Sequence, residues 1–121
     1  MNTTATEILE RVYKYCKEKF GDILCDAYLY GSYARGDYDK WSDVDIFVTV
    51  KSDYPEIEDL YDPIAEIGSE LSLEYDITVS IVIDPINQFN KYSKVLPYYI
   101  NILSEGIKYA AAWRKISIIK N

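Results

Sequence analysis

Histidine is absent from this sequence, and cysteine is scarce. Without histidine, the chain cannot contain a Ser-His-Asp triad, a Cys-His pair or a histidine metal site. The two cysteines, Cys16 and Cys25, are too few for a disulfide framework or a thiolate metal site, and we expect both to be small core residues. Any catalysis must therefore depend on carboxylates, hydroxyls, lysine or arginine.

Basic residues and long apolar runs are also lacking. The chain has 13 Lys and Arg against 20 Asp and Glu, a net charge of -7, which argues against general binding to nucleic-acid backbones. No apolar run is long enough to span a membrane and there is no signal peptide, so we expect no membrane partner and a cytoplasmic location. Hydrophobic residues still make up 49% of the 121 residues, which predicts one globular domain over residues 1–121.

Hydrophobic periodicity predicts three helices and three strands. The helices are expected over residues 4–20, 57–71 and 97–104, and the strands over residues 23–30, 44–50 and 75–83. A helix separates the second and third strands, so these should be parallel neighbours, whereas the short connection between the first two predicts antiparallel pairing. Pro63 lies within the second helical pattern, so that helix either kinks or begins there.

Two aspartates open the second predicted strand. Side chains alternate along a strand, so Asp43 and Asp45 should share a face with their Cα atoms about 6.5 Å apart. If the next strand is parallel and begins at Asp76, that carboxylate should join them across a spacing of about 4.8 Å. Asp84 would lie roughly 25 Å away at the other end of that strand, and we expect it to be a turn residue before Pro85.

Three carboxylates at one edge of a sheet repel each other, and a divalent cation relieves the repulsion. A site made only of oxygen ligands favours Mg²⁺ or Mn²⁺, and Mg²⁺ usually binds together with phosphates. Gly31 and Ser32, at the end of the first predicted strand, suit a phosphate because a glycine turn exposes its backbone and serine adds a hydroxyl. Isolated D-x-D or Gly-Ser pairs are often only solvated, but their combination at the spacing G-S-x10-D-x-D is much more specific.

The sequence resembles the minimal nucleotidyltransferases (MNT proteins) of the DNA polymerase β-like superfamily. Their fingerprint appears as "GSYARG" at residues 31–36 and "SDVD" at residues 42–45. The resemblance extends to Asp76, placed like the third carboxylate of the family, and to "YYINILSEGI" at residues 98–107. It implies an α+β fold in which helices pack on a small mixed sheet.

The resemblance also implies a reaction and a set of site residues. Asp43, Asp45 and Asp76 would hold two Mg²⁺ ions, with Mn²⁺ as an alternative, and a hydroxyl would attack the α-phosphate of ATP, releasing pyrophosphate. Asp76 is the expected base for that hydroxyl, and Glu74, which would share its strand face, is the alternative. Arg35 either contacts phosphate or braces the loop.

Small members of the family resemble antitoxins that modify a helical HEPN partner on tyrosine, so the expected acceptor is a hydroxyl of such a protein. The segment after Tyr109 could add a partner surface through Trp113, Ile116, Ile118 and Ile119, or could pack on the same core. One alternative is an aminoglycoside-type transferase acting on a small molecule, which here would need a homodimer to complete its pocket. Another is an antitoxin that neutralises its partner by contact alone.

Overall fold

The computed structural model describes residues 3–110 of the chain. Its helices are α1 (Thr3–Phe20), α2 (Ser32–Arg35), α3 (Tyr61–Tyr75), α4 (Ile86–Tyr92) and α5 (Pro97–Glu105), with short 3-10 turns at Gly21–Ile23 and Glu56–Leu60. Its strands are β1 (Leu24–Tyr30), β2 (Val44–Val50), β3 (Val79–Pro85) and β4 (Ile107–Lys108). Helices and strands therefore combine in the α+β architecture that the sequence predicts.

The strands form one mixed sheet in the order β3-β2-β1-β4. Strands β1 and β2 are antiparallel, and β2 and β3 are parallel, as the connection lengths predict. The helix α3 makes the crossover between the two parallel strands, and the short β4 adds to the other edge by pairing with β1. The last residue of β1 and the first residues of β2 and β3 consequently lie together. Below, the edge of the sheet means this end of the strands and not an outer strand.

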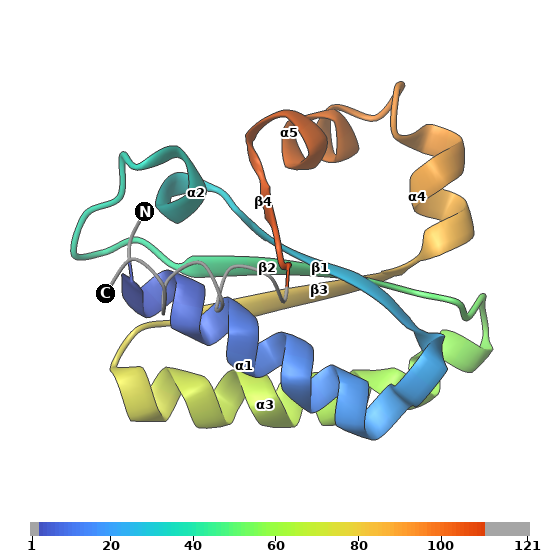
Figure 1. The fold of residues 1–121 in the computed structure, drawn as a ribbon, viewed down its shortest axis with the longest axis horizontal. Helices are drawn as coiled ribbons and strands as arrows, with labels where there is room; N and C mark the ends of the chain where they lie inside the picture. Colours follow the sequence, from blue (N-terminus) through green and yellow to red (C-terminus); the bar gives the residue numbers. More distant parts are fainter. Residues whose placement is uncertain (1–2, 111–121) are drawn as a thin grey trace.

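Helices α1 and α3 cover one face of the sheet, while α4 and α5 cover the other (Figure 1). The apolar residues of α1 recur at helical spacing, so one side of the helix is buried against the sheet. The alternate residues Val44, Ile46, Val48 and Val50 of β2 belong to this larger core. On the opposite face, Tyr28 and Phe47 from the sheet pack with residues of α4 and α5, namely Phe89, Tyr99 and Ile102.

The third strand begins later than the sequence predicts. Asp76 is not its first residue but the C-cap of α3, with φ 53° and ψ 40°, a left-handed conformation that aspartate tolerates better than most residues. Because Asp76 ends the helix, the chain needs Ile77 and Thr78 to reach the sheet, and β3 begins at Val79.

Asp84 also departs from expectation, because it is a strand residue rather than a turn residue. It pairs with Thr49 in the parallel ladder, and the hydroxyl of Tyr99 donates a hydrogen bond of 2.7 Å to its carboxylate. The predicted turn at this point is wrong because Pro85 ends β3 and the helix α4 follows at once. The sequence reading missed both α4 and β4.

Two smaller expectations are also decided. Cys16 is fully buried as predicted, but Cys25 is only partly buried, where the pairing of β1 with β2 is irregular. Pro63 lies in the first turn of α3, which begins two residues earlier at Tyr61, and proline is tolerated in this first turn. Within residues 3–110, no helix is both long and apolar enough to cross a membrane. Trp113, Ile116, Ile118 and Ile119 lie outside the described residues.

Candidate active site

The predicted phosphate turn and the two aspartates lie together at one edge of the sheet. Tyr30, the last residue of β1, pairs directly with Asp45 of β2, so Gly31 turns away beside this carboxylate. Asp43 is exposed just before β2, and Asp45 is partly buried within it. Residues far apart in the sequence thus meet because β1 and β2 are antiparallel.

The raised pKa of Asp45 indicates that a positive charge would be favourable at this edge of the sheet. Burial raises the pKa of the Asp45 carboxyl, the negative charge of Asp43 raises it further, and the positive charge of Arg35 acts in the opposite direction. Ionised Asp45 is therefore destabilised by its surroundings. A divalent cation held between the two carboxylates would remove this penalty, and two carboxylates form a donor set that suits Mg²⁺ or Mn²⁺.

Gly31 is required by this arrangement for two reasons. Its φ of 74° and ψ of -156° lie in a region that is essentially restricted to glycine. A Cβ atom at this position would also lie 2.5 Å from Oδ2 of Asp45. The first group that a larger side chain here would displace is therefore the carboxylate of Asp45.

The short helix α2 follows Gly31 immediately. The carbonyl oxygen of Gly31 accepts hydrogen bonds from the backbone N–H groups of Ala34 and Arg35, at 3.0 and 3.1 Å. Since the first N–H groups of a helix have no partner within it, those at Ser32 and Tyr33 are available to an anion, and Ser32 adds a hydroxyl. The turn thus has donors suited to phosphate next to carboxylates suited to a metal.

The loop between α2 and β2 is ordered by Asp39 and Ser42. The backbone N–H of Asp39 donates to Oγ of Ser42 at 2.9 Å, and the N–H of Trp41 donates to Oδ1 of Asp39 at 2.8 Å. This local network fixes the backbone directly before Asp43. Asp39 was not identified from the sequence, although aspartate is a common turn residue because its side chain can accept from a backbone N–H two residues on.

Arg35 joins the loop to α5. Its guanidinium lies 3.2 Å from the carboxylate of Asp37 and 3.4 Å from that of Glu105. It also lines a cavity of about 200 Å³ with Gly31, Glu105 and three further residues, Tyr30, Tyr98 and Asn101. Arg35 therefore braces the loop in this structure, and its position in the wall of the cavity keeps it next to the phosphate turn.

Two tyrosine hydroxyls lie at the same cavity. The hydroxyl of Tyr98 donates to that of Tyr30 at 2.8 Å, and their rings meet edge to face. Burial and this hydrogen bond raise the pKa of Tyr98, with smaller contributions from Asp84 and Asp45, so its hydroxyl keeps its proton at neutral pH. This pair links α5 to the end of β1, beside Asp45.

The third predicted carboxylate does not join the pair. Among residues 3–110, no three His, Cys, Asp or Glu side chains come close enough together to hold a metal ion. Asp76 caps α3, and Glu74 belongs to that helix, where it forms an ion pair with Arg11. The residue that β3 places opposite Asp45 is Ser80, so a serine hydroxyl stands across a strand spacing of about 4.8 Å.

Sequence reasoning missed Ser80 because the third strand was predicted to begin at residue 75, four residues before the observed start at Val79. Paired residues in a parallel ladder share a face, so Ser80 and Asp45 face the same side of the sheet. The signal that could have found Ser80 is the alternation of the strand itself. Val79 and Ile83 are buried in the larger core, which directs Ser80 to the opposite face.

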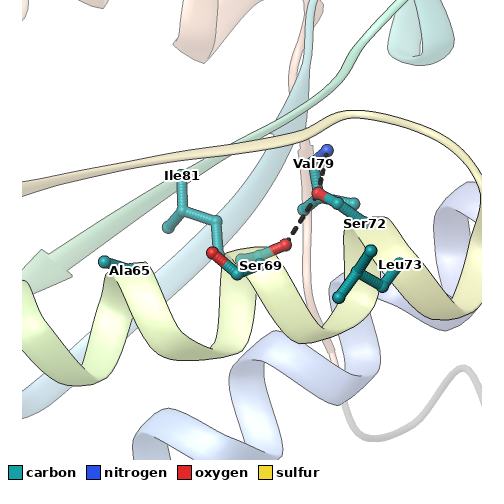
Figure 2. Close-up of a pocket in the computed structure, with 7 residues that line it drawn as sticks. Ala65, Ser69, Ser72, Leu73, Val79 and Ile81 are labelled. Atoms are coloured by element: carbon teal, nitrogen blue, oxygen red, sulfur yellow. Dashed lines mark hydrogen bonds between the residues drawn. The ribbon is translucent and has the colours of Figure 1, made fainter.

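A larger groove, of about 510 Å³, lies elsewhere, between α3 and the outer edge of β3 (Figure 2). The hydroxyl of Ser72 accepts from the N–H of Val79 at 2.8 Å and donates to the carbonyl of Gly68 at 2.7 Å. The groove is lined by Ala65, Gly68, Ser69, Ser72, Leu73, Val79 and Ile81, none of which titrates. The groove thus has no group for acid-base or metal chemistry, which favours the edge near Asp45 as the active site.

Comparison with known proteins identifies the family. Residues 9–109 match the family model described as "Nucleotidyltransferase domain". A relative from Methanocaldococcus jannaschii, named "Putative protein adenylyltransferase MJ0141", is 43% identical over 81 residues, which cover 64% of this chain and 79% of the relative.

Two solved structures share the fold. A toxin-antitoxin with AMP-PNP aligns with a TM-score of 0.55 at 19% identity and covers 92% of this chain and 86% of its own. A tri-AMPylated Shewanella oneidensis HEPN toxin in complex with MNT antitoxin provides a chain that aligns with a TM-score of 0.51 at 16% identity. That alignment covers 94% of this chain and 78% of the other.

Proposed function

Because this chain belongs to the nucleotidyltransferase domain family, we propose that it transfers AMP from ATP to a hydroxyl group of a partner protein. The observation that carries the proposal is the close approach of the glycine turn to the carboxylate of Asp45. Gly31 lies so close to Asp45 that a phosphate bound at the turn would be next to any metal that Asp45 holds. The named adenylyltransferase relative supports adenine as the base.

In this proposal, Asp43 and Asp45 hold Mg²⁺ or Mn²⁺, with the hydroxyl of Ser80 beside them. The bound metal would supply Lewis-acid stabilisation of charge on the phosphate oxygens. Ser32 and the backbone N–H groups at the start of α2 bind the β- and γ-phosphates, and Arg35 neutralises part of their charge once it leaves Glu105.

The transfer is a displacement at the α-phosphorus. The acceptor hydroxyl oxygen forms a bond to this phosphorus while the bond to the bridging oxygen of the β-phosphate breaks, and pyrophosphate leaves with the electron pair. The hydroxyl proton passes to water, which reaches the site because Asp43 is exposed. The chain's own residues thus bind and orient the nucleotide at an open edge of the sheet.

The proposed partner is a helical protein of the HEPN type, for which this chain would act as antitoxin. The structural relatives support this, since one is an MNT antitoxin in complex with an AMPylated HEPN toxin. A second support is the size of the cavity beside Gly31. At about 200 Å³ it would leave little room for a small-molecule acceptor beside the nucleotide, so the acceptor would come from another protein. A cytoplasmic location is part of the proposal because ATP is the substrate.

The test uses the double variant Asp43→Asn with Asp45→Asn. Manganese with AMP-PNP should raise the melting temperature of the wild-type chain, because a ligand that binds only the folded state stabilises it. The double variant should fold but lose this shift and the release of pyrophosphate from ATP. An unchanged shift in the double variant would show that these carboxylates do not hold the metal.

A further inference from the structure

One side of α5 lines the cavity beside the phosphate turn. Tyr98, Asn101 and Glu105 are separated by three and four residues, so they share one side of the helix, and all three line this cavity. Gly31 and Arg35, at the phosphate turn, line it as well. The cavity therefore connects the turn that is proposed to hold the phosphates with a set of side chains from α5.

The helix α5 also lies on the face of the sheet to which the metal site belongs. Asp45 and Phe47 are alternate residues of β2, so their side chains point to the same face. The ring of Phe47 packs against that of Tyr99 of α5, with the ring centres 5.8 Å apart. Figure 1 shows α5 on this face, which α1 and α3 leave uncovered. A nucleotide bound at Gly31 and Asp45 would therefore have α5 beside it.

The side chains that line the cavity differ in how far their hydrogen-bonding groups are already used. The hydroxyl of Tyr98 donates to that of Tyr30, and the carboxylate of Glu105 is 3.4 Å from the guanidinium of Arg35. Within residues 3–110, by contrast, no hydrogen bond engages the side-chain amide of Asn101. This amide is therefore a neutral donor and acceptor that the cavity wall leaves available to a ligand.

A primary amide matches one purine better than the other. Adenine has the N6 amino donor next to a ring-nitrogen acceptor, so an amide oxygen and an amide NH₂ can bond to it side by side. Guanine has the acceptor O6 in place of N6, so the amide oxygen would face another acceptor. Tyr98 adds an aromatic wall for a base, and its ring is fixed by Tyr30 and Phe47, at ring-centre distances of 5.6 and 5.9 Å.

We propose that this side of α5 is the nucleoside subsite, in which the ring of Tyr98 packs on the base and the amide of Asn101 selects adenine over guanine. This inference rests on the proposed transfer of AMP. It assigns the choice of base to one residue, because the phosphate turn and the carboxylates contact only groups that all nucleoside triphosphates share.

The test measures the affinity of the full chain with Mn²⁺ for AMP-PNP, GMP-PNP and tripolyphosphate by isothermal titration calorimetry. The wild type should prefer AMP-PNP over GMP-PNP roughly ten-fold, and Asn101→Ala should remove this preference by weakening AMP-PNP. Asn101→Asp should favour GMP-PNP, because a carboxylate only accepts and guanine has two adjacent donors, N1–H and the N2 amino group. All variants should bind tripolyphosphate as the wild type does, because it has no base.

The matched control is Asn90→Ala, since Asn90 is an exposed asparagine on α4, outside the lining of the cavity. It should keep the wild-type preference. The inference is overturned if Asn101→Ala and Asn101→Asp still prefer AMP-PNP as the wild type does, or if they lose tripolyphosphate as strongly as AMP-PNP. It is also overturned if the control loses the preference equally. A wild type that binds none of the three ligands would overturn the proposed function too, whereas an unchanged preference in the Asn101 variants would leave that function intact.

Discussion

Replacing Gly31 by alanine should damage the fold and the metal site through one added methyl group. The φ of 74° and ψ of -156° cost a non-glycine residue about 1–3 kcal/mol. At roughly 4 °C per kcal/mol for a chain of this size, the melting temperature should fall by roughly 4–12 °C. The new Cβ would also lie 2.5 Å from Oδ2 of Asp45, so the carboxylate must rotate away.

The second effect is measured as loss of stabilisation by ligand. Mn²⁺ and AMP-PNP at about 100 times their dissociation constant should stabilise the wild type by about 2.7 kcal/mol. A displaced Asp45 should weaken affinity at least about ten-fold and remove about 1.4 kcal/mol of this stabilisation. Differential scanning calorimetry with and without ligand gives both quantities.

The matched control is Gly21→Ala, because Gly21 also has a positive φ, of 58°, but nothing lies within 4 Å of the added Cβ. It should lose stability and keep the full ligand shift. In a background of Asp45→Ala, the Gly31→Ala change should cost less than in the wild type, since the oxygen that it meets is gone. A full ligand shift in Gly31→Ala would refute the assignment of Asp45 as a metal ligand.

Three further predictions concern the same edge of the sheet. Ser32→Ala should weaken ATP binding by on the order of 1 kcal/mol in calorimetric titrations and weaken AMP binding much less, because AMP lacks the outer phosphates; equal losses would contradict a role in holding them. Burial and Asp43 raise the pKa of Asp45, so its ionisation destabilises the fold as pH rises above 3.8; Asp45→Asn should therefore raise the metal-free melting temperature at pH 7, with the gain disappearing in acid. Ser80→Ala should lower the affinity for Mn²⁺ with AMP-PNP more than Asp76→Asn does. The opposite order would indicate that Asp76, and not Ser80, is the third group beside the metal.

The sequence alone predicted the parts of the site that depend on local spacing. The bounds of β2, the turn at Gly31 and Ser32, and the shared face of Asp43 and Asp45 all follow from residues within a short segment. The pairing directions of the first three strands also follow, because they depend on connection length. The structure confirms the bounds of β2, the turn at Gly31 and the pairing directions, whereas the shared face of Asp43 and Asp45 stays a prediction, because β2 begins at Val44.

Tertiary contacts decided what local patterns could not. The pattern "YDITVSIVI" is compatible with several strand starts, and the left-handed cap at Asp76 and the hydrogen bond from Val79 to Ser72 select the start at Val79. That choice of register places Ser80 opposite Asp45, because strand pairing is set by packing against α3 and β2 over long sequence distances. The close approach of Gly31 to Asp45 arises in the same way, since it depends on the antiparallel pairing of β1 with β2.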